Sequence, residues 1–363
     1  MSSIEVLHRY TAAESPTGDP RALAALAEIL EEDAGRAGFG TERESHPTGD
    51  HLIWTLPARE TAGAPILLLT HYDTVWPVGT LAGMPWSVEG DVIRGPGVYD
   101  TKAGIVALLA AAGRIAGVPH PEVRVIVVAD EEIGSPTAGS LVRAEAGRAR
   151  AVLGLEPPHP GGDLKTGRRG STRARIEVAG IEAHAALDPD AGVNAIDELI
   201  DQLVRFRSAV AGRPVLLNTG TIAGGGRTNV VAGAAHADLG LRFIDPADEQ
   251  AVLGALKDLS TVRPRAHVST SLLSHRPTWR PDAEGAELLS RIRTIAAGIG
   301  QQIDGRPADG AADTNTTGAL GRPTVDGLAP AGGGAHARTE WVSSEGITKR
   351  IALLAALLTD LAA

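Results

Sequence analysis

Histidine and carboxylate side chains follow three short apolar runs of this sequence. His71 with Asp73, the triplet Asp130–Glu132, and Glu156 each come where such a run ends. Apolar runs of this length predict buried strands of a parallel sheet, and ligands of open α/β sheets gather at the carboxyl ends of the strands. The alternative for each cluster taken alone is a loop residue in turn contacts or a solvated run of acids. The runs are Ile66–Leu69, Val123–Val128 and Ala151–Leu155.

Two further candidates lie in glycine-rich loops. Asp100 belongs to the loop GPGVYDTKAG at 95–104, and His336 belongs to GGGAHAR near the C-terminus. The spacing of the first loop fits neither the dinucleotide fingerprint nor the P-loop, so its carboxylate indicates a metal site. The combined candidates supply two imidazoles and three carboxylates, a set that suits two zinc ions bridged by one carboxylate. They are His71, Asp100, Glu132, Glu156 and His336.

Composition narrows the class of protein. The 363 residues are 43% hydrophobic and 21% charged, as in an ordinary globular protein of about two domains. A net charge of -10 with only 3% aromatic residues argues against a nucleic-acid partner. The chain has no cysteine, so a metal must be held by His, Asp and Glu. No signal-peptide pattern and no apolar run long enough to span a bilayer is present, which predicts a cytoplasmic protein without a membrane partner.

The elements around these candidates predict two domains. Strands that alternate with helices indicate an α/β domain with a mixed, mostly parallel sheet flanked by helices, formed by residues 1–170 and 278–363. Residues 171–277 read as an inserted small α+β domain, a lid and dimerisation domain, in the order strand, helix, strand, strand, helix, strand. The expected helices are 21–39, 103–116, 194–210, 251–259, 284–299 and 343–361. The expected strands are 66–70, 123–128, 151–155, 173–180, 235–243, 267–273 and 323–328, and residues 220–232 are expected to be turn-rich.

The sequence resembles the M20 metallopeptidase family, and within it the glutamate carboxypeptidase-like group, over nearly the whole chain. The resemblance implies that Asp100 bridges two Zn²⁺ ions, with Co²⁺ or Mn²⁺ as substitutes. His71 and Glu156 would complete one zinc site, and Glu132 and His336 the other. The motifs that carry the resemblance are HYDTV (71–75), GPGVYDTKAG (95–104), ADEEIGS (129–135), LEP (155–157), EAHAALDPDAGVNAI (182–196), RTNVVAG (227–233), LRF (241–243) and GGGAHARTEWV (332–342).

The same resemblance implies roles for residues that do not bind metal. Glu131 would be the general base, Asp73 would orient His71, and the peptide bond from Asp100 to Thr101 would be cis. His184 would polarise the carbonyl of the bond to be cleaved, often from the partner subunit of a homodimer.

Asn229 and Arg242 match residues of this family that hold the carboxylate of the substrate. A guanidinium group suits a carboxylate, whereas the alternative for Arg242 is a strand arginine on a solvated face. Departures at Ala186, Leu187 and Ala312 lie toward the substrate and leave the ligand set intact.

The expected function is hydrolysis of an amide bond in a small carboxylate-bearing substrate. The enzyme would release a C-terminal amino acid or cleave an N-acyl amino acid, as glutamate carboxypeptidase-like enzymes do. The alternatives within the same chemistry are an N-acyl amino acid deacylase, a dipeptidase and a biosynthetic tailoring amidohydrolase. The alternative from another class is a catalytically silent binding protein, which the retention of Glu131 and all five ligands argues against.

Overall fold

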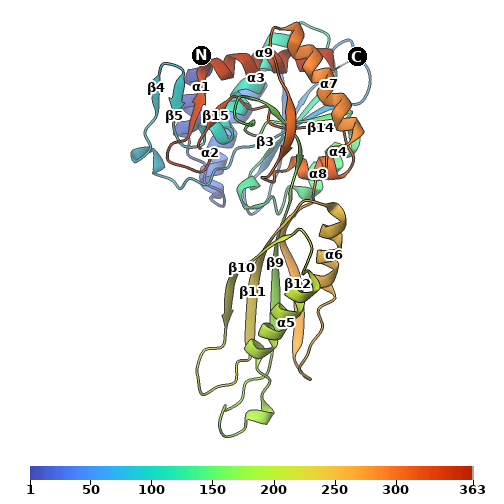
Figure 1. The fold of residues 1–363 in the computed structure, drawn as a ribbon. Coiled ribbons are helices and arrows are strands. Elements are labelled where there is room, and N and C mark those ends of the chain that lie inside the picture. Colours follow the sequence, from blue (N-terminus) through green and yellow to red (C-terminus); the bar gives the residue numbers. More distant parts are fainter. Residues whose placement is uncertain (362–363) are drawn as a thin grey trace. The chain divides into compact units, whose positions relative to one another are not determined.

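The computed structural model describes residues 1–361, and the contacts between Cα atoms divide the chain into two units. The first unit contains Met1–Arg168 and resumes at Arg280, and the second unit is Arg169–Trp279. Figure 1 draws both units as ribbons coloured along the sequence. The second unit is thus a continuous insertion between two segments of the first.

The first unit is built on a six-stranded sheet in the order β1-β2-β6-β3-β7-β14. The strands from β6 to β14 pair in parallel, whereas β2 pairs antiparallel with both β1 and β6. The prediction of a mixed, mostly parallel sheet is therefore confirmed. The strands are β1 (Gly40–Glu44), β2 (His51–Leu56), β6 (Val123–Val128), β3 (Ile66–His71), β7 (Ala151–Gly154) and β14 (Thr324–Val325).

The central strand β3 shows why an apolar run predicted a buried strand. All six of its residues are buried, and strands pair with both of its edges. Leu67 and Leu69 belong to one hydrophobic core. Ile66 and Leu68 belong to another. Because alternate residues of a strand point to opposite faces, the sheet must be covered on both sides.

Helices provide this cover. Helix α3 (Ala103–Ile115) packs against α9 (Ser344–Asp360), and both contribute to the core that contains Leu68. Helix α4 (Gly139–Arg148) contributes to the opposite core. Within residues 1–361, no helix combines the length and the apolar character that crossing a membrane requires. The other helices of this unit are α1 (Ser3–Ala12), α2 (Pro20–Arg36), α7 (Ala283–Gly298) and α8 (Thr314–Ala319).

Short strands bring the two glycine-rich loops together. In a four-stranded sheet of the order β15-β16-β5-β4, Trp341 of β16 pairs with Arg94 of β5. The segment that follows His336 therefore lies beside the segment that precedes Asp100. The short strands are β4 (Ser87–Glu89), β5 (Val92–Arg94), β15 (Gly332–Gly333), β16 (Trp341–Ser343), and the parallel pair β8 (Leu164–Arg168) and β13 (Gly305–Ala308). Single helical turns are η1 (Thr80–Ala82), η2 (Val98–Lys102), η3 (Glu131–Ile133) and η4 (Pro189–Ala191).

The second unit is a four-stranded antiparallel sheet in the order β10-β11-β9-β12, with two helices. Buried residues alternate with less buried ones along β9, so one face packs on a core and the other does not. The predicted order of strand, helix, strand, strand, helix and strand is confirmed. The elements are β9 (Gly170–Ala179), α5 (Ala195–Ala209), β10 (Leu216–Gly224), β11 (Ala234–Phe243), α6 (Pro246–Lys257) and β12 (His267–Arg276).

Three predicted ranges are wrong in their bounds. Strand β10 extends to Gly224, into the range predicted to be turn-rich, because an edge strand that is mostly exposed lacks an apolar pattern. Helix α6 begins before residue 251, since the Asp245 side chain caps it and Pro246 fits its first turn. The expected strand 323–328 is only two residues long. It ends at Val325, and the carboxylate of the next residue, Asp326, accepts the N–H of Gly327, a residue with a φ of 86°.

Candidate metal centre

The carboxyl ends of three neighbouring parallel strands carry the predicted residues. His71 is the last residue of β3, Glu131 and Glu132 lie just beyond β6, and Glu156 lies just beyond β7. These strands are adjacent in the order β6-β3-β7, so their ends meet at one edge of the sheet. The two loops add Asp100 and His336 to the same place.

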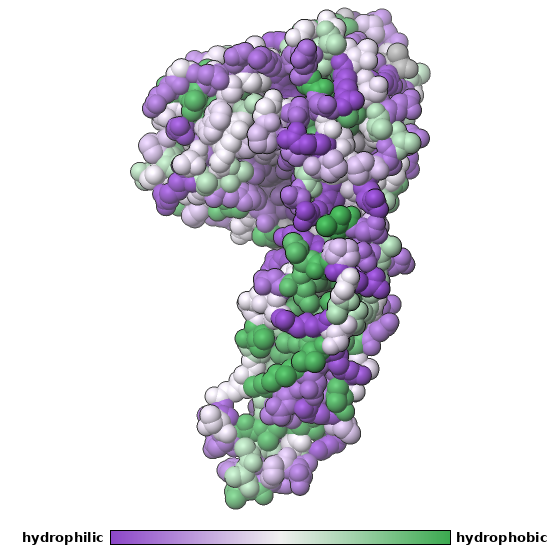
Figure 2. All heavy atoms as spheres, viewed as in Figure 1, coloured by the Kyte–Doolittle hydropathy of each residue, from purple (hydrophilic) through white to green (hydrophobic). Residues whose placement is uncertain are grey.

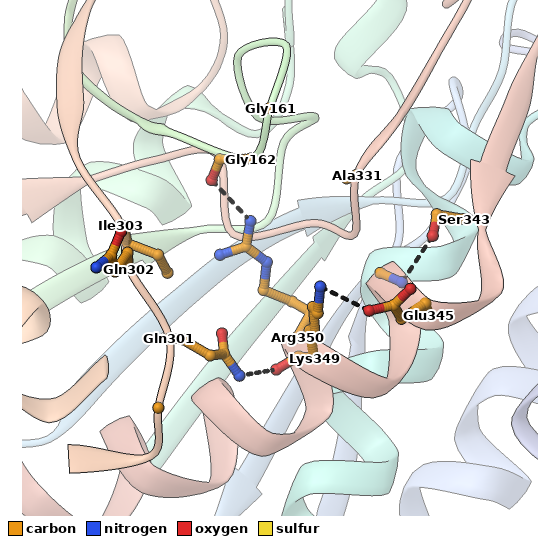
Figure 3. A pocket seen from close by; sticks show the side chains of 12 residues that line it. Gly161, Gly162, Gln301, Gln302, Ile303, Ala331, Ser343, Glu345, Lys349 and Arg350 are labelled. Atoms are coloured by element: carbon orange, nitrogen blue, oxygen red, sulfur yellow. Dashed lines mark hydrogen bonds and ion pairs between the residues drawn. The ribbon is translucent and has the colours of Figure 1, made fainter. Parts of the chain in front are cut away.

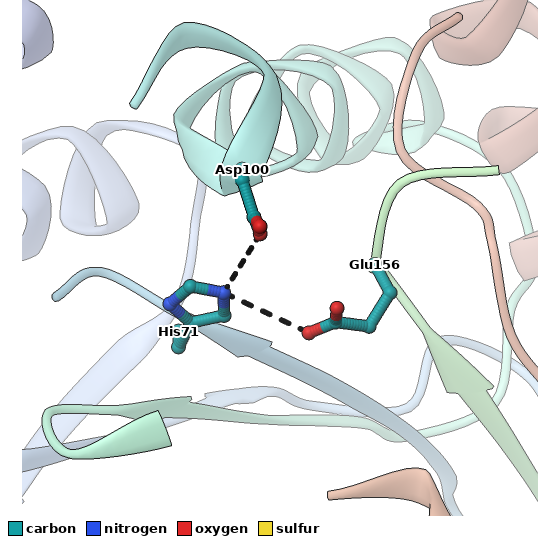
Figure 4. A group of neighbouring side chains, drawn as sticks. All are labelled: His71, Asp100 and Glu156. Carbon is teal, nitrogen blue, oxygen red and sulfur yellow. Dashed lines mark hydrogen bonds and ion pairs between the residues drawn. The ribbon is translucent and has the colours of Figure 1, made fainter. Parts of the chain in front are cut away.

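The first group of side chains consists of His71, Asp100 and Glu156 (Figure 4). Nε2 of His71 lies 3.2 Å from Oδ1 of Asp100 and 3.7 Å from Oε1 of Glu156. The three come from a strand end, a loop and a second strand end, and they point toward a common centre (Figure 4). One imidazole nitrogen and two carboxylate oxygens therefore face one another.

The second group consists of Asp100, Glu132 and His336. Nε2 of His336 lies 3.0 Å from Oε2 of Glu132 and 3.3 Å from Oδ2 of Asp100. Asp100 thus directs one oxygen at each group and belongs to both. A carboxylate shared in this way is what a bridge between two metal ions requires.

The donor set of both groups fits a divalent metal. Each offers one nitrogen and two oxygens that lie within 4.8 Å of one another, which leaves room for further ligands on a zinc ion. Positive charge is required here because three carboxylates converge. Without a metal ion the histidines supply it: hydrogen bonds to Asp100 and Glu132 raise the pKa of His336 to about 10.

The pKa values in the first group also indicate a site for positive charge. Burial disfavours a charged His71, but hydrogen bonds to Asp100 and Asp73 outweigh this and raise its pKa well above the ordinary value. Burial, followed by the nearby charge of Asp100, raises the pKa of Glu156 to about 7. A cation in the middle of these groups would replace such protons.

Asp73 connects the two strand ends. Its side chain is fully buried, and Oδ1 lies 3.3 Å from Nδ1 of His71. The same carboxylate accepts the backbone N–H groups of Glu131 and Glu132, at 3.2 Å each. Asp73 therefore fixes both the imidazole ring of His71 and the turn that carries the predicted base.

Glu156 also depends on a buried carboxylate. Its N–H lies 3.3 Å from Oδ1 of Asp326, a residue that is completely buried. Arg168 donates to Oδ2 of Asp326 from Nε and Nη2, at 2.8 and 2.6 Å, and Thr314 donates to the same oxygen. The sequence did not identify Asp326 or Arg168, because no motif spacing relates them to Glu156.

Glu340 holds the loop that carries Asp100. Its side chain is buried, and Oε1 accepts the N–H groups of Tyr99 and Asp100, at 2.9 and 3.1 Å. Oε2 accepts the N–H of Gly97 and the indole N–H of Trp76, at 3.0 and 2.9 Å. Glu340 was present in the motif GGGAHARTEWV, but no role was predicted for it.

The peptide bond between Asp100 and Thr101 is cis, which confirms the prediction for this bond. The bond lies within η2, whose N-cap residue Gly97 has a φ of 73°. Both features belong to the loop that Glu340 holds.

The three residues predicted to contact substrate lie in the second unit. Nδ1 of His184 accepts the N–H groups of Ala186 and Leu187, at 3.2 and 3.0 Å, so the ring proton of the neutral side chain is on Nε2. Asn229 lies beside this segment, since its carbonyl oxygen accepts the N–H of Ala185 at 3.0 Å. The exposed His184 side chain can therefore donate a hydrogen bond from Nε2.

Arg242 is not brought to His184 and Asn229. It is exposed near the far end of β11, a strand that begins at Ala234, shortly after Asn229. At about 3.4 Å per residue, the eight steps from Ala234 to Arg242 span about 27 Å. Arg242 pairs with Ser171, at the end of the sheet where the chain enters the unit. One copy of this unit cannot present all three side chains to one small substrate.

We predict that Glu340→Gln weakens metal binding as well as stability. The amide NH₂ would face N–H donors, and leaving buried donors unpaired costs about 1–3 kcal/mol. Loss of a group that positions a ligand loop lowers metal affinity by about 10–100-fold. Competition with a chromophoric chelator measures the affinity, and thermal unfolding measures the stability.

Glu345→Gln is the matched control for this variant. Glu345 is an exposed acid in the first turn of α9, and its side chain pairs with Lys349. It should leave metal affinity unchanged. A folded Glu340→Gln protein that binds zinc as tightly as the control would show that Glu340 does not position Asp100.

Comparison with known proteins extends the resemblance to the whole chain. The model of Peptidase family M20/M25/M40 matches residues 67–360. Carboxypeptidase G2 of Pseudomonas sp. (strain RS-16) is 28% identical over 372 residues, which cover 99% of this chain and 89% of that protein. A succinyl-diaminopimelate desuccinylase of Gluconobacter oxydans (strain 621H) is 32% identical over 300 residues, which cover 76% of this chain and 77% of that protein.

A solved structure gives the same fold. The M20 family metallo-carboxypeptidase Sso-CP2 from Sulfolobus solfataricus matches with a TM-score of 0.72 and 16% identity, covering 99% of this chain and 98% of that one. The family match extends over most of the chain and includes every residue of the two candidate ligand groups. This protein therefore belongs to peptidase family M20/M25/M40 and is a metal-dependent hydrolase.

Proposed function

We propose that this protein is a dinuclear zinc enzyme that hydrolyses an amide bond next to a free carboxylate. It would release a C-terminal amino acid or cleave an N-acyl amino acid. The observation that carries the proposal is the shared position of Asp100 between two groups of ligands, with Glu131 adjacent to the ligand Glu132.

The residues divide the chemistry among them. Two zinc ions held by His71, Asp100, Glu132, Glu156 and His336 would supply Lewis acidity to the attacked carbonyl and the attacking water. Glu131 takes a proton from the water and passes it to the leaving nitrogen, so that the C–N bond breaks into a carboxylic acid and an amine. His184 donates a hydrogen bond from Nε2 to the carbonyl oxygen as negative charge develops there. Asn229 and Arg242 hold the carboxylate of the substrate.

The relatives support this substrate class. One is named a carboxypeptidase, and the other is named for removing a succinyl group from diaminopimelate. Both names describe hydrolysis at an amino acid. An N-acyl amino acid deacylase, a dipeptidase and a tailoring amidohydrolase share this chemistry and differ only in the acyl half of the substrate.

We further propose that the enzyme is a homodimer in which His184 and Asn229 act on the partner subunit's metal centre. The support is the length of β11: Asn229 and the segment of His184 lie near its start at Ala234, and Arg242 lies about 27 Å further along the strand. Exposed apolar side chains on the second unit favour an interface, and Figure 2 shows hydrophobic residues on the viewed face over α5. Those on α5 are Ile200 and Val204, and those on β10 are Leu216 and Ile222.

A substrate panel tests the function. The zinc-loaded protein is assayed with N-acyl amino acids, dipeptides and folate-like glutamates, each paired with the same compound in which a carboxamide replaces the free carboxylate. We expect turnover of free acids and little turnover of their carboxamides. Equal rates on both members of every pair would contradict the substrate class, and no turnover of any compound would favour the silent binding protein.

We predict that Glu131→Gln keeps the metal ions and loses most of the turnover. Proton transfer by a positioned carboxylate contributes about 10²–10⁴-fold, whereas Glu131 is not among the proposed ligands. Metal analysis and kcat are measured on the same preparation. If kcat stays near the wild-type value, the base is another residue.

We predict that Arg242→Ala raises KM and that His184→Ala mainly lowers kcat. The two variants are then mixed under conditions of subunit exchange, at a substrate concentration low enough that each alone is nearly inactive. The mixture should restore about a quarter of the wild-type activity, because about half of the dimers are mixed and each has one intact site. If both residues acted within one chain, no mixed dimer would have an intact site. A mixture no more active than its components, or a monomer at working concentration, would contradict the proposed dimer.

A further inference from the structure

Figure 3 shows a hollow in the first unit that none of the proposed metal ligands lines. Its volume is about 290 Å³, which is far more than one water molecule needs. Its walls come from the loop at 161–162, from residues 300–303 and from the first turns of α9. None of the five proposed metal ligands lines it.

Arg350 is the buried charged group in its wall. The residue is only 5% exposed, and its guanidinium group lies next to the loop that carries Gly162 (Figure 3). Nε donates to the carbonyl oxygen of Ala329 at 3.0 Å, and Nη2 donates to that of Gly162 at 3.2 Å. Nη1 is buried and has no hydrogen-bond partner among residues 1–361.

Arg350 has no carboxylate as a partner in the described part of the chain. The contrast is Arg168, which is also buried and pairs with Asp326 through two nitrogens. Burial lowers the pKa of Arg350 to about 10, and Tyr99 is the one ionisable group that works against this decrease. A buried cation without a counter-charge is costly, so a group of opposite charge in the hollow would stabilise it.

The donors of Arg350 suit an oxyanion. A guanidinium group has five N–H donors, and two of them are used by carbonyl oxygens, which leaves three. The free donors include both hydrogens of Nη1 and one of Nη2, the pair that binds two oxygens of one carboxylate, sulfate or phosphate group.

The remaining charges of the hollow favour an anion. Lys349 and Glu345 pair with each other at 2.7 Å and cancel, so the net positive charge comes from Arg350. The hollow also lies at the amino end of α9, where the carboxylate of Asp91 already occupies the positive end of the helix dipole. The first N–H groups of that helix are bound by Asp91 and Ser343, so the side chain of Arg350 must make the direct contact.

We propose that this hollow is a binding site for a small oxyanion, with Arg350 as its counter-charge. A bound anion would also stabilise the backbone next to Glu156, a proposed metal ligand, through Arg350 and Ala329. Ala329 accepts from Arg350 through its carbonyl oxygen and donates through its N–H to the carbonyl oxygen of Glu156, at 3.1 Å. None of the residues proposed to bind metal or substrate lines the hollow, so the proposal does not depend on the proposed function.

Calorimetric titration of the zinc-loaded protein tests the proposal. Sulfate, phosphate and acetate are titrated separately at constant ionic strength, with chloride as the balancing anion. We expect saturable binding of at least one of them, and the ranking separates a tetrahedral ligand from a carboxylate. The absence of saturable binding for all three would overturn the proposal.

Two variants show where the anion binds. Arg350→Met removes the counter-charge and should abolish binding. Gln302→Glu keeps the shape of a side chain that lines the hollow and adds a negative charge, so it should weaken binding about tenfold or more. This second variant keeps the test decisive if Arg350→Met fails to fold.

The matched controls change the same charges elsewhere. Arg114→Met removes an exposed arginine of α3, and Gln250→Glu adds a negative charge on an exposed position of α6. Both should bind the anion as the wild-type protein does. Binding that persists unchanged in Gln302→Glu and in folded Arg350→Met would place the anion at another site, such as the metal centre, and would contradict the proposal.

Discussion

The convergence of three carboxylates at one edge of a sheet is the constraint on which the rest of the structure depends. Two like charges about 4 Å apart repel by roughly 4 kcal/mol at an effective dielectric constant of 20. Asp100 and Glu156 approach Nε2 of His71, while Asp100 and Glu132 approach Nε2 of His336. This arrangement persists only with positive charge at its centre. Protonated histidines can supply that charge, and in our account two metal ions replace them.

Other buried carboxylates hold the ligands in place. Asp73 accepts N–H groups from the turn after β6, Glu340 from the loop that carries Asp100, and Asp326 from Glu156. Each of these carboxylates lies far along the sequence from at least one of the N–H groups that it binds. The parallel strands place the ligands at one edge, and these hydrogen bonds restrict how each ligand segment can move.

The sequence predicted the features that a short segment encodes. The run Ile66–Leu69 could be identified as a buried strand because both of its faces contact hydrophobic cores, and the histidine at its end followed from the geometry of parallel sheets. The ligand loop around Asp100 needed the family resemblance, since its glycine spacing alone is ambiguous. Both depend on residues close to one another in the chain.

Features that depend on distant partners were not predicted. Glu340 binds amides about 240 positions earlier in the chain, and nothing in the local pattern distinguishes it from an exposed acid. Strand β10 lacks apolar alternation because it is an exposed edge strand, so Gly220 and its neighbours suggested a turn. The N-terminal helix α1 and the strands β1 and β2 also escaped prediction. The separation of Arg242 from His184 became evident only from the register of β11.

Metal stoichiometry of the purified protein tests the central claim most directly. Equilibrium dialysis against zinc, with metal and protein measured in the same sample, should give two ions per chain. Glu132→Gln and Glu156→Gln should each lose one ion, whereas Asp100→Asn should weaken both sites because its carboxylate is shared. Fewer than two ions per wild-type chain with the fold intact, or an Asp100→Asn variant that binds two ions with unchanged affinity, would contradict a bridged dinuclear centre.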